Sequence, residues 1–176
     1  MGFVKPRPVV APEPGFVYCD GLMIQVEVTN EQRSTPVEED RVRSIVEMII
    51  ADARINDAEI SIAVVDDPTI HKLNRRHLNH DYATDVLSFV LERQENHLEG
   101  EIVVSGETAF SAAGDYGWSA EEELLLYVIH GSLHLVGFDD QTPEAREQMR
   151  ALERRWLLEM DITPNDSLSP REHQGD

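Results

Sequence analysis

Two histidines and an aspartate in this chain have the spacing of ligands to one metal ion. Residues 130–140 read HGSLHLVGFDD, within an apolar stretch that favours a helix. His130 and His134, four residues apart, would lie on one helix face with Cβ atoms about 5–6 Å apart, so both imidazoles can reach one ion. Gly137 would end the helix and turn the chain, which brings Asp140 toward the same ion. Three protein ligands leave one coordination position for water, as in catalytic zinc sites.

The same spacing, His-x3-His-x2-Gly-x2-ligand, occurs in the metzincin peptidases. Those enzymes place a glutamate directly after the first histidine as general base, whereas this chain has Gly131 there. Peptide hydrolysis by that mechanism is therefore not expected. The candidates for a general base are Asp85, Glu101 and Asp139. Asp139 is also the alternative third ligand, but the spacing favours Asp140 and leaves Asp139 to hydrogen-bond in the turn or to an imidazole.

The elements that position these residues follow from the periodicity of apolar side chains. Alternation and apolar runs predict strands at residues 23–28, 59–65, 84–91 and 100–105, the last two joined as a hairpin. Apolar spacing and capping residues predict helices at residues 35–53, 70–77, 107–113, 119–135 and 142–160. For the first helix, Thr35 is the expected N-cap, Pro36 the first helical residue and Glu38 the partner in a capping box.

This order of elements predicts an α+β fold, with a single layer of about four mixed strands packed with helices around a central metal-binding helix. Four of the nine prolines fall in residues 1–21, which we expect to form an irregular arm. Residues 22–162 would form one domain and residues 163–176 a polar tail.

Composition restricts the class of protein. No apolar run approaches the roughly 18 residues of a membrane span, and no secretory signal is visible, so a cytoplasmic location is expected. Cys19 is the single cysteine, which leaves no partner for an internal disulfide. A net charge of −19 repels polyanions. Contacts to RNA would then come from a local basic patch or from the metal itself. Basic residues gather in residues 72–80, and this cluster is equally consistent with a binding patch and with a solvated helix end.

Three sequence blocks resemble one family. HGSLHLVGFD is similar to the signature of the YbeY family, bacterial metal-dependent endoribonucleases implicated in rRNA maturation and ribosome quality control. LNR with TDVLSF (Leu73–Arg75 and Thr84–Phe89) and GEIVVS with TA (Gly100–Ser105 and Thr108–Ala109) resemble two further family segments in the same order. The resemblance covers roughly residues 22–160.

The resemblance implies a site as well as an activity. One divalent ion, Zn²⁺ or alternatively Ni²⁺, would be held by His130, His134 and Asp140 at a cleft between the metal helix and the sheet, where single-stranded RNA lies. A ribosomal subunit or ribosomal protein is the implied partner. The candidate site residues divide into a catalytic set and a substrate-binding set, namely His130, Asp85 and Arg76 for catalysis and Asn74, Arg75, Thr84 and Ser88 for substrate binding.

Two positions depart from the family pattern. The third ligand of the family is usually histidine, but here it is Asp140, which adds negative charge and can change metal preference. The usual family arginine that faces substrate corresponds to Leu78, with Arg75 and Arg76 nearby but out of register. These departures keep two alternatives open: a non-catalytic ribosome-assembly factor with a structural metal, and a metallohydrolase of a substrate other than RNA.

Overall fold

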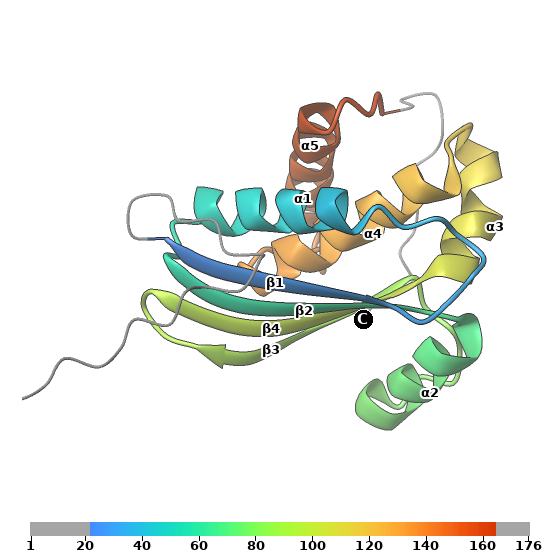
Figure 1. Ribbon diagram of the computed structural model, residues 1–176, viewed down its shortest axis with the longest axis horizontal. Helices are drawn as coiled ribbons and strands as arrows, with labels where there is room; N and C mark the ends of the chain where they lie inside the picture. The colour runs from blue at the N-terminus through green and yellow to red at the C-terminus, as the bar shows by residue number, and fades with distance from the viewer. Residues whose placement is uncertain (1–21, 165–176) are drawn as a thin grey trace, which may run out of the picture.

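The computed structural model describes residues 22–164 (Figure 1). These coincide with the predicted domain 22–162 and the first two residues of the predicted tail, whereas the predicted arm, residues 1–21, lies outside the described residues. The strands are β1 (Met23–Asn30), β2 (Asp57–Val65), β3 (Val86–Arg93) and β4 (His97–Ser105). The helices are α1 (Glu39–Asp52), α2 (Asp67–Leu78), α3 (Gly106–Tyr116), α4 (Ala120–Leu135) and α5 (Pro143–Glu159).

The strands form one mixed sheet in the order β1-β2-β4-β3. β1, β2 and β4 run parallel, with Val26 opposite Ile60 and Ile60 opposite Gly100. β3 runs antiparallel to β4 and forms the edge, as the predicted hairpin requires. The α+β class with four mixed strands is therefore confirmed.

The predicted start of the first helix is wrong. α1 begins at Glu39, and Glu38 in the N-cap position makes no side-chain cap. Thr35 is instead buried, where its hydroxyl donates to the Gly106 carbonyl oxygen at 2.7 Å and its backbone N–H donates to the Gln32 side chain at 2.9 Å. A long-range contact to the start of α3 has taken the residue that local capping chemistry assigned to α1.

The caps predicted for the last two helices are confirmed. Ser119 and Glu122 form a reciprocal capping box at the start of α4. Thr142 accepts a hydrogen bond from the Ala145 N–H and Pro143 occupies the first turn of α5. These caps fix where α4 enters and where the chain leaves the turn that follows it.

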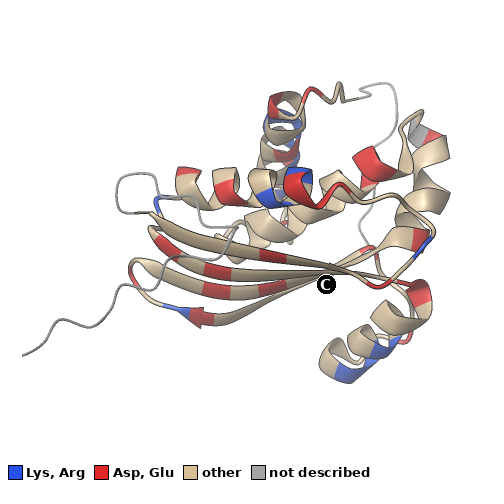
Figure 2. Cartoon of the chain, in the orientation of Figure 1, with Lys and Arg blue, Asp and Glu red and all other residues tan. Residues whose placement is uncertain are grey.

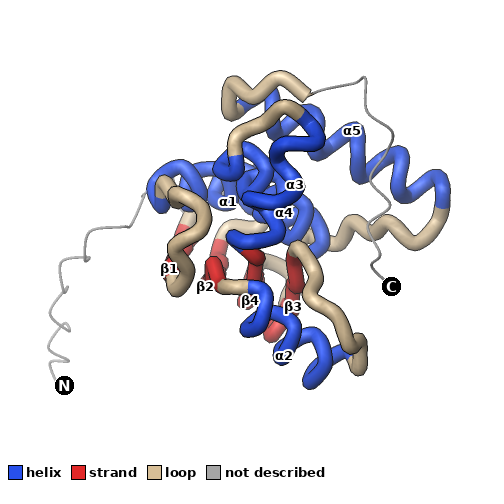
Figure 3. Tube along the Cα trace, turned by 90° about the vertical axis from the view of Figure 1, so that its right-hand side faces the viewer, coloured by secondary structure: helices blue, strands red, loops and turns tan. Residues whose placement is uncertain are grey.

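Helices cover the two faces of the sheet unequally. α1 and α4 lie on one face with α5 outside them, and α2 lies on the other face at one end of the sheet (Figures 1 and 3). The main core lies between the sheet and α1 and α4, where α4 buries residues on all of its sides. Under α2 there is only a small cluster of buried side chains, namely Val65, Ile70, Leu87 and Val103.

The charges are also distributed unequally. Acidic residues are spread over the sheet and most helices, whereas α2 carries more lysine and arginine than aspartate and glutamate (Figure 2). This helix carries Lys72, Arg75 and Arg76 of the predicted basic patch. Among the described residues, no helix is long and apolar enough to cross a membrane.

Candidate metal centre

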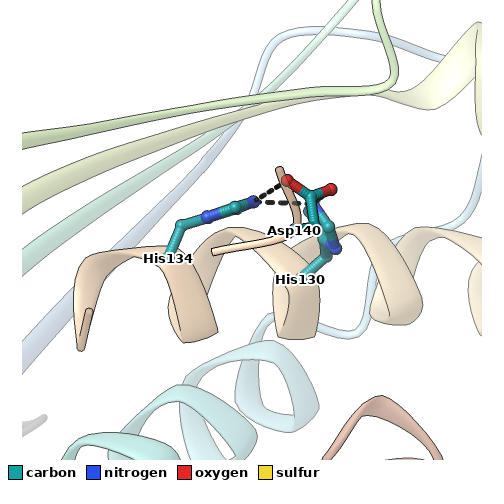
Figure 4. A group of neighbouring side chains, drawn as sticks. All are labelled: His130, His134 and Asp140. Atoms are coloured by element: carbon teal, nitrogen blue, oxygen red, sulfur yellow. Dashed lines mark hydrogen bonds and ion pairs between the residues drawn. The ribbon is translucent and has the colours of Figure 1, made fainter. Parts of the chain in front are cut away.

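The side chains of His130, His134 and Asp140 converge at one point (Figure 4). The two Nε2 atoms lie 2.9 Å apart. The Asp140 carboxylate oxygens lie 3.8 Å from Nε2 of His130 and 4.0 Å from Nε2 of His134. Each residue thus offers one donor atom to a common position, with all three atoms within 4.8 Å of one another.

A carboxylate holds the His130 ring on the side away from the convergent group. Its side chain is buried in α4, and its Nδ1 lies 2.6 Å from Oε1 of Glu153, a residue of α5 that is itself buried. A carboxylate accepts the Nδ1 proton and thereby directs the unprotonated Nε2 toward the centre of the group. Glu153 is the kind of partner that holds a ligating imidazole in one tautomer and one orientation.

The turn after α4 orients His134. The Phe138 N–H donates to the Leu133 carbonyl and the Gly137 N–H to the His134 carbonyl, which is the Schellman pattern of a helix end, and Gly137 has a φ of +106°. The predicted glycine turn is therefore present. The Phe138 carbonyl oxygen then lies 2.9 Å from Nδ1 of His134 and can only accept, so this nitrogen carries the proton and Nε2 does not. The turn thus ends the helix and fixes the tautomer of His134.

The protonation of the ring nitrogens of His130 and His134 is compatible with a cation between the two rings. With both Nδ1 atoms donating elsewhere, two unprotonated nitrogens face each other at 2.9 Å, and their lone pairs repel unless a proton or a metal ion lies between them. Burial lowers the pKa of His134 below its usual 6.5, and the neighbouring His130 lowers it further, which favours the neutral ring. Two neutral imidazoles and a carboxylate oxygen are donors that zinc accepts.

Asp140, rather than its neighbour, belongs to the convergent group. Asp139 is exposed and accepts a hydrogen bond from the Gln141 N–H at 3.1 Å, which holds it in the turn. Asp140 is only partly exposed and faces both imidazoles. This arrangement agrees with the assignment that the residue spacing favoured.

The three donors open into a cleft of about 330 Å³, near the lower end of the range for small-ligand pockets. One wall is formed by α4 and its following turn, and the other by α2, the loop 79–85 and β3. Five further candidate residues named from the sequence line this cleft with the metal-site group: Asn74, Thr84, Asp85, Ser88 and Asp139.

Asp85 lies at the entry to β3 and is locally fixed. Its Oδ1 accepts from the Val86 N–H at 2.9 Å and from the Thr84 hydroxyl at 3.0 Å. Its carbonyl oxygen also accepts from the Ser105 N–H, which ties the strand entry to the end of β4. The Thr84 and Asp85 side chains are thereby presented to the cleft as one hydrogen-bonded unit.

The two arginines predicted to contact phosphate do not line the cleft. Arg75 is exposed on α2, where it lies 3.8 Å from the Asp81 carboxylate, and Arg76 is exposed on the same helix. Leu78, at the position of the usual family arginine, does line the cleft and is 46% exposed. Arg75 and Arg76 could therefore contact only a part of the RNA that lies outside the cleft.

Glu101 lies on the other face of the sheet. Its neighbours in β4, Gly100 and Ile102, pack against Leu135 and Gly131 of α4, and alternate residues of a strand point to opposite faces. Glu101 therefore cannot act as general base at this cleft.

Close packing explains the absence of the peptidase glutamate. A Cβ atom at Gly131 would lie 2.9 Å from Ile102 Cγ2 and 3.1 Å from Val86 Cγ2, so the helix and the sheet leave no room for a side chain. A glutamate here would also bury a charge against the core. The zincin mechanism is thus excluded by packing as well as by residue type.

Sequence reasoning missed Glu153 and the Phe138 carbonyl. Glu153 lies four residues after Met149 and three before Trp156, both buried. A carboxylate at apolar spacing was the available signal. The Phe138 contact comes from the backbone and has no side-chain signal.

Comparison with known proteins gives consistent matches. The sequence profile of the family described as "Endoribonuclease YbeY" matches residues 27–161. Proteins named "Endoribonuclease YbeY" include one from Desulfitobacterium hafniense, 40% identical over 130 residues, covering 68% of this chain and 83% of that protein. Another from Pelotomaculum thermopropionicum is 36% identical over 149 residues, covering 78% of this chain and 98% of that protein.

One match is higher in identity but shorter. The protein of the same name from Rhodopirellula baltica is 51% identical over 96 residues, and the chain spans half of that relative's length. A solution structure of a Thermotoga maritima protein aligns with a TM-score of 0.56 at 26% identity, covering 84% of this chain and 99% of the other.

Proposed function

The chain belongs to the YbeY family of endoribonucleases, and from this we propose that it is a metal-dependent endoribonuclease that cleaves single-stranded RNA in rRNA maturation and ribosome quality control. The observation that carries the proposal is the convergence of His130, His134 and Asp140 at a cleft. The ribosomal subunit or a ribosomal protein is the proposed partner, and the cytoplasm the proposed compartment.

The three convergent residues would hold one divalent cation, for which zinc is the proposed identity and nickel the alternative. Such a cation supplies Lewis acidity toward a phosphodiester oxygen and lowers the pKa of a bound water. Glu153 and the Phe138 carbonyl oxygen accept hydrogen bonds from the Nδ1 atoms of His130 and His134. These bonds leave each Nε2 unprotonated and fix the direction of each ring.

Other cleft residues would bind and orient the RNA. Ser88 offers a hydroxyl donor to phosphate or ribose. The Thr84 hydroxyl donates its proton to Asp85, so it offers acceptor lone pairs to a ribose hydroxyl, and Asp85 is the proposed general base. Asn74 is buried and donates to the Tyr82 carbonyl oxygen at 3.0 Å, so it positions the loop of the cleft wall. Arg75 and Arg76 would attract the strand where it passes α2, which concentrates positive charge in a chain of net charge −19 (Figure 2).

Cleavage assays test the proposal directly. Metal-loaded wild type is expected to cut single-stranded RNA faster than structured RNA, and His130→Ala is expected to lose this activity by at least about a hundredfold because it removes a metal ligand. Cleavage by neither protein, or equally by both, favours the non-catalytic assembly factor. Cleavage of an ester or peptide library but of no RNA favours the hydrolase of another substrate.

Metal analysis tests the site separately from the activity. Mass spectrometry of protein purified without added ions is expected to find about one equivalent of zinc or nickel. His134→Ala is expected to lose it. Equal metal content in the two proteins would contradict the assigned ligands.

A further inference from the structure

We propose that His80 and Tyr82 form a platform on which a base of the bound RNA stacks, in the same cleft as the convergent metal-site group. The inference rests on the proposed function and deepens it, because it names how an unpaired strand is distinguished. It concerns a part of the cleft to which the preceding sections assign no chemistry.

The two rings have the geometry of a stacking surface. Their planes are inclined by only 8° and their centroids lie 5.5 Å apart, which is an offset stack. Both residues line the cleft, and Tyr82 is 38% exposed. Aromatic faces that are open to a binding cleft are the surfaces on which proteins stack the bases of single strands.

The loop that carries the rings is held in place by α2. Asn74 donates from Nδ2 to the Tyr82 carbonyl oxygen at 3.0 Å. The neighbouring Asp81 carboxylate lies 3.0 Å from Nε2 of His71. Asn79 ends the helix in the left-handed conformation and starts the loop. Because contacts at Asp81 and Tyr82 already hold the loop, the loop loses less conformational freedom when a base binds.

The chemistry of the surrounding wall favours a base over a phosphate. None of the described residues that line the cleft is a lysine or an arginine. The same cleft is also lined by Leu78 and Val90, which are 46% and 48% exposed and offer apolar contact. A base has an apolar face that suits such a wall, whereas a phosphate at the ring pair would meet no lysine or arginine of the cleft lining. In a duplex the base faces are covered by their neighbours, so the platform selects an unstacked strand.

Binding of RNA with and without bases tests the platform. The probe is a fluorescein-labelled oligouridine of about 12 nucleotides, compared with an abasic ribose-phosphate chain of equal length. Anisotropy is recorded in the cold, and each sample is then run on a gel to confirm that the RNA is intact. The variants are Tyr82→Ala, Tyr82→Leu and Tyr82→Trp, and the matched control is Phe110→Ala, which removes a 63% exposed ring from α3, outside the cleft lining.

Tyr82→Ala and Tyr82→Leu are both expected to weaken oligouridine binding about tenfold, while Tyr82→Trp and the control bind as wild type does. The abasic chain is expected to bind all of these proteins equally weakly. A leucine variant that binds oligouridine as tightly as wild type overturns the platform, because apolar area alone would then suffice. Wild type that binds both chains equally, or a loss in Tyr82→Ala that is equal for both chains, also overturns it.

The test separates this inference from the proposed function. Cleavage of unlabelled RNA is measured on the same protein samples. A protein that discriminates bases through Tyr82 but cuts no RNA contradicts only the nuclease activity. A protein that cuts RNA while Tyr82→Leu binds as wild type does contradicts only the platform.

Discussion

The α4 wall of the cleft is part of the main core, whereas the opposite wall, made by α2 and the loop 79–85, rests on a small separate cluster of side chains. Twelve of the 16 residues of α4 are buried, against two of the 12 residues of α2. The two metal-site histidines are therefore held by α4, the most deeply buried helix. The wall proposed to touch RNA includes α2, the helix with the smallest buried share. Ligands must be held to a few tenths of an ångström, while a wall that receives flexible strands can shift more easily.

The largest expected effect tests this packing difference with two buried leucines. Leu133 lies in the main core and Leu87 in the small cluster, and they are 1% and 5% exposed. Leu133→Ala is expected to lower the free energy of unfolding by about 4 kcal/mol and Leu87→Ala by about 2 kcal/mol, since the small cluster can collapse around the deletion. Urea unfolding measures both, with the 55% exposed Leu158→Ala as control. Equal losses would contradict the comparison.

The next effect concerns the support of the α4 wall by α5. Glu153→Gln keeps the shape of the contact to His130 but removes the charge, and is expected to lower metal affinity about 10- to 100-fold. Competition with a chelator of known affinity measures it. Glu147→Gln, an exposed glutamate on the same helix, is the control and should bind the metal as wild type does. An unchanged affinity in Glu153→Gln would show that the carboxylate does not act on the ligand.

A smaller effect is expected at the α2 wall. Leu78→Arg adds a cation to the cleft lining and is expected to tighten single-stranded RNA binding about threefold at low salt, with a slope against log salt concentration about one unit steeper. The control, Met23→Arg, adds the same charge at a residue of β1 that is 54% exposed and outside the cleft. Equal gains in both variants would mean that net charge, and not the position, sets the affinity.

The smallest expected effect concerns two histidines, His134 in α4 and His97 at the start of β4. Burial lowers the pKa of His134 below 6.5, whereas the Asp57 carboxylate, 2.8 Å from Nδ1 of His97, raises the pKa of His97 above 6.5. As pH rises in metal-free protein, His134 is therefore expected to lose its proton before His97 does. Ring-proton NMR shifts record both titrations in one sample. The reverse order would contradict the burial that the α4 wall imposes.

Sequence patterns predicted the elements of the fold because apolar periodicity, capping boxes and the hairpin are local signals. The convergent group was predictable for the same reason, since His130, His134 and the turn to Asp140 lie within one short segment. The start of α1 was mispredicted because Thr35 is used by a residue 71 positions away. The partner of His130 was missed because it comes from another helix, 23 residues further on.

The opposite wall was predicted less well, and the reason is geometric. Arg75 and Arg76 are close in sequence to the cleft residue Asn74, but the helix turns them toward solvent. Which side of α2 faces the cleft depends on how the helix packs on side chains of β2, β3 and β4, and these contacts join residues that are far apart in the sequence. Glu101 was named as a general-base candidate, although alternation with Gly100 and Ile102, which pack against α4, places it on the other face of the sheet.

The contact of Gly131 with β3 and β4 also constrains how this protein can change over evolutionary time. A side chain at Gly131 would overlap Ile102 and Val86, so a substitution there would be selected against as a folding defect before its effect on catalysis matters. The loop 79–85 is less constrained by packing, because its side chains other than those of His80, Thr84 and Asp85 are exposed. New RNA preferences would therefore arise by substitution at residues 79–83, with Thr84, Asp85 and the reaction itself inherited unchanged.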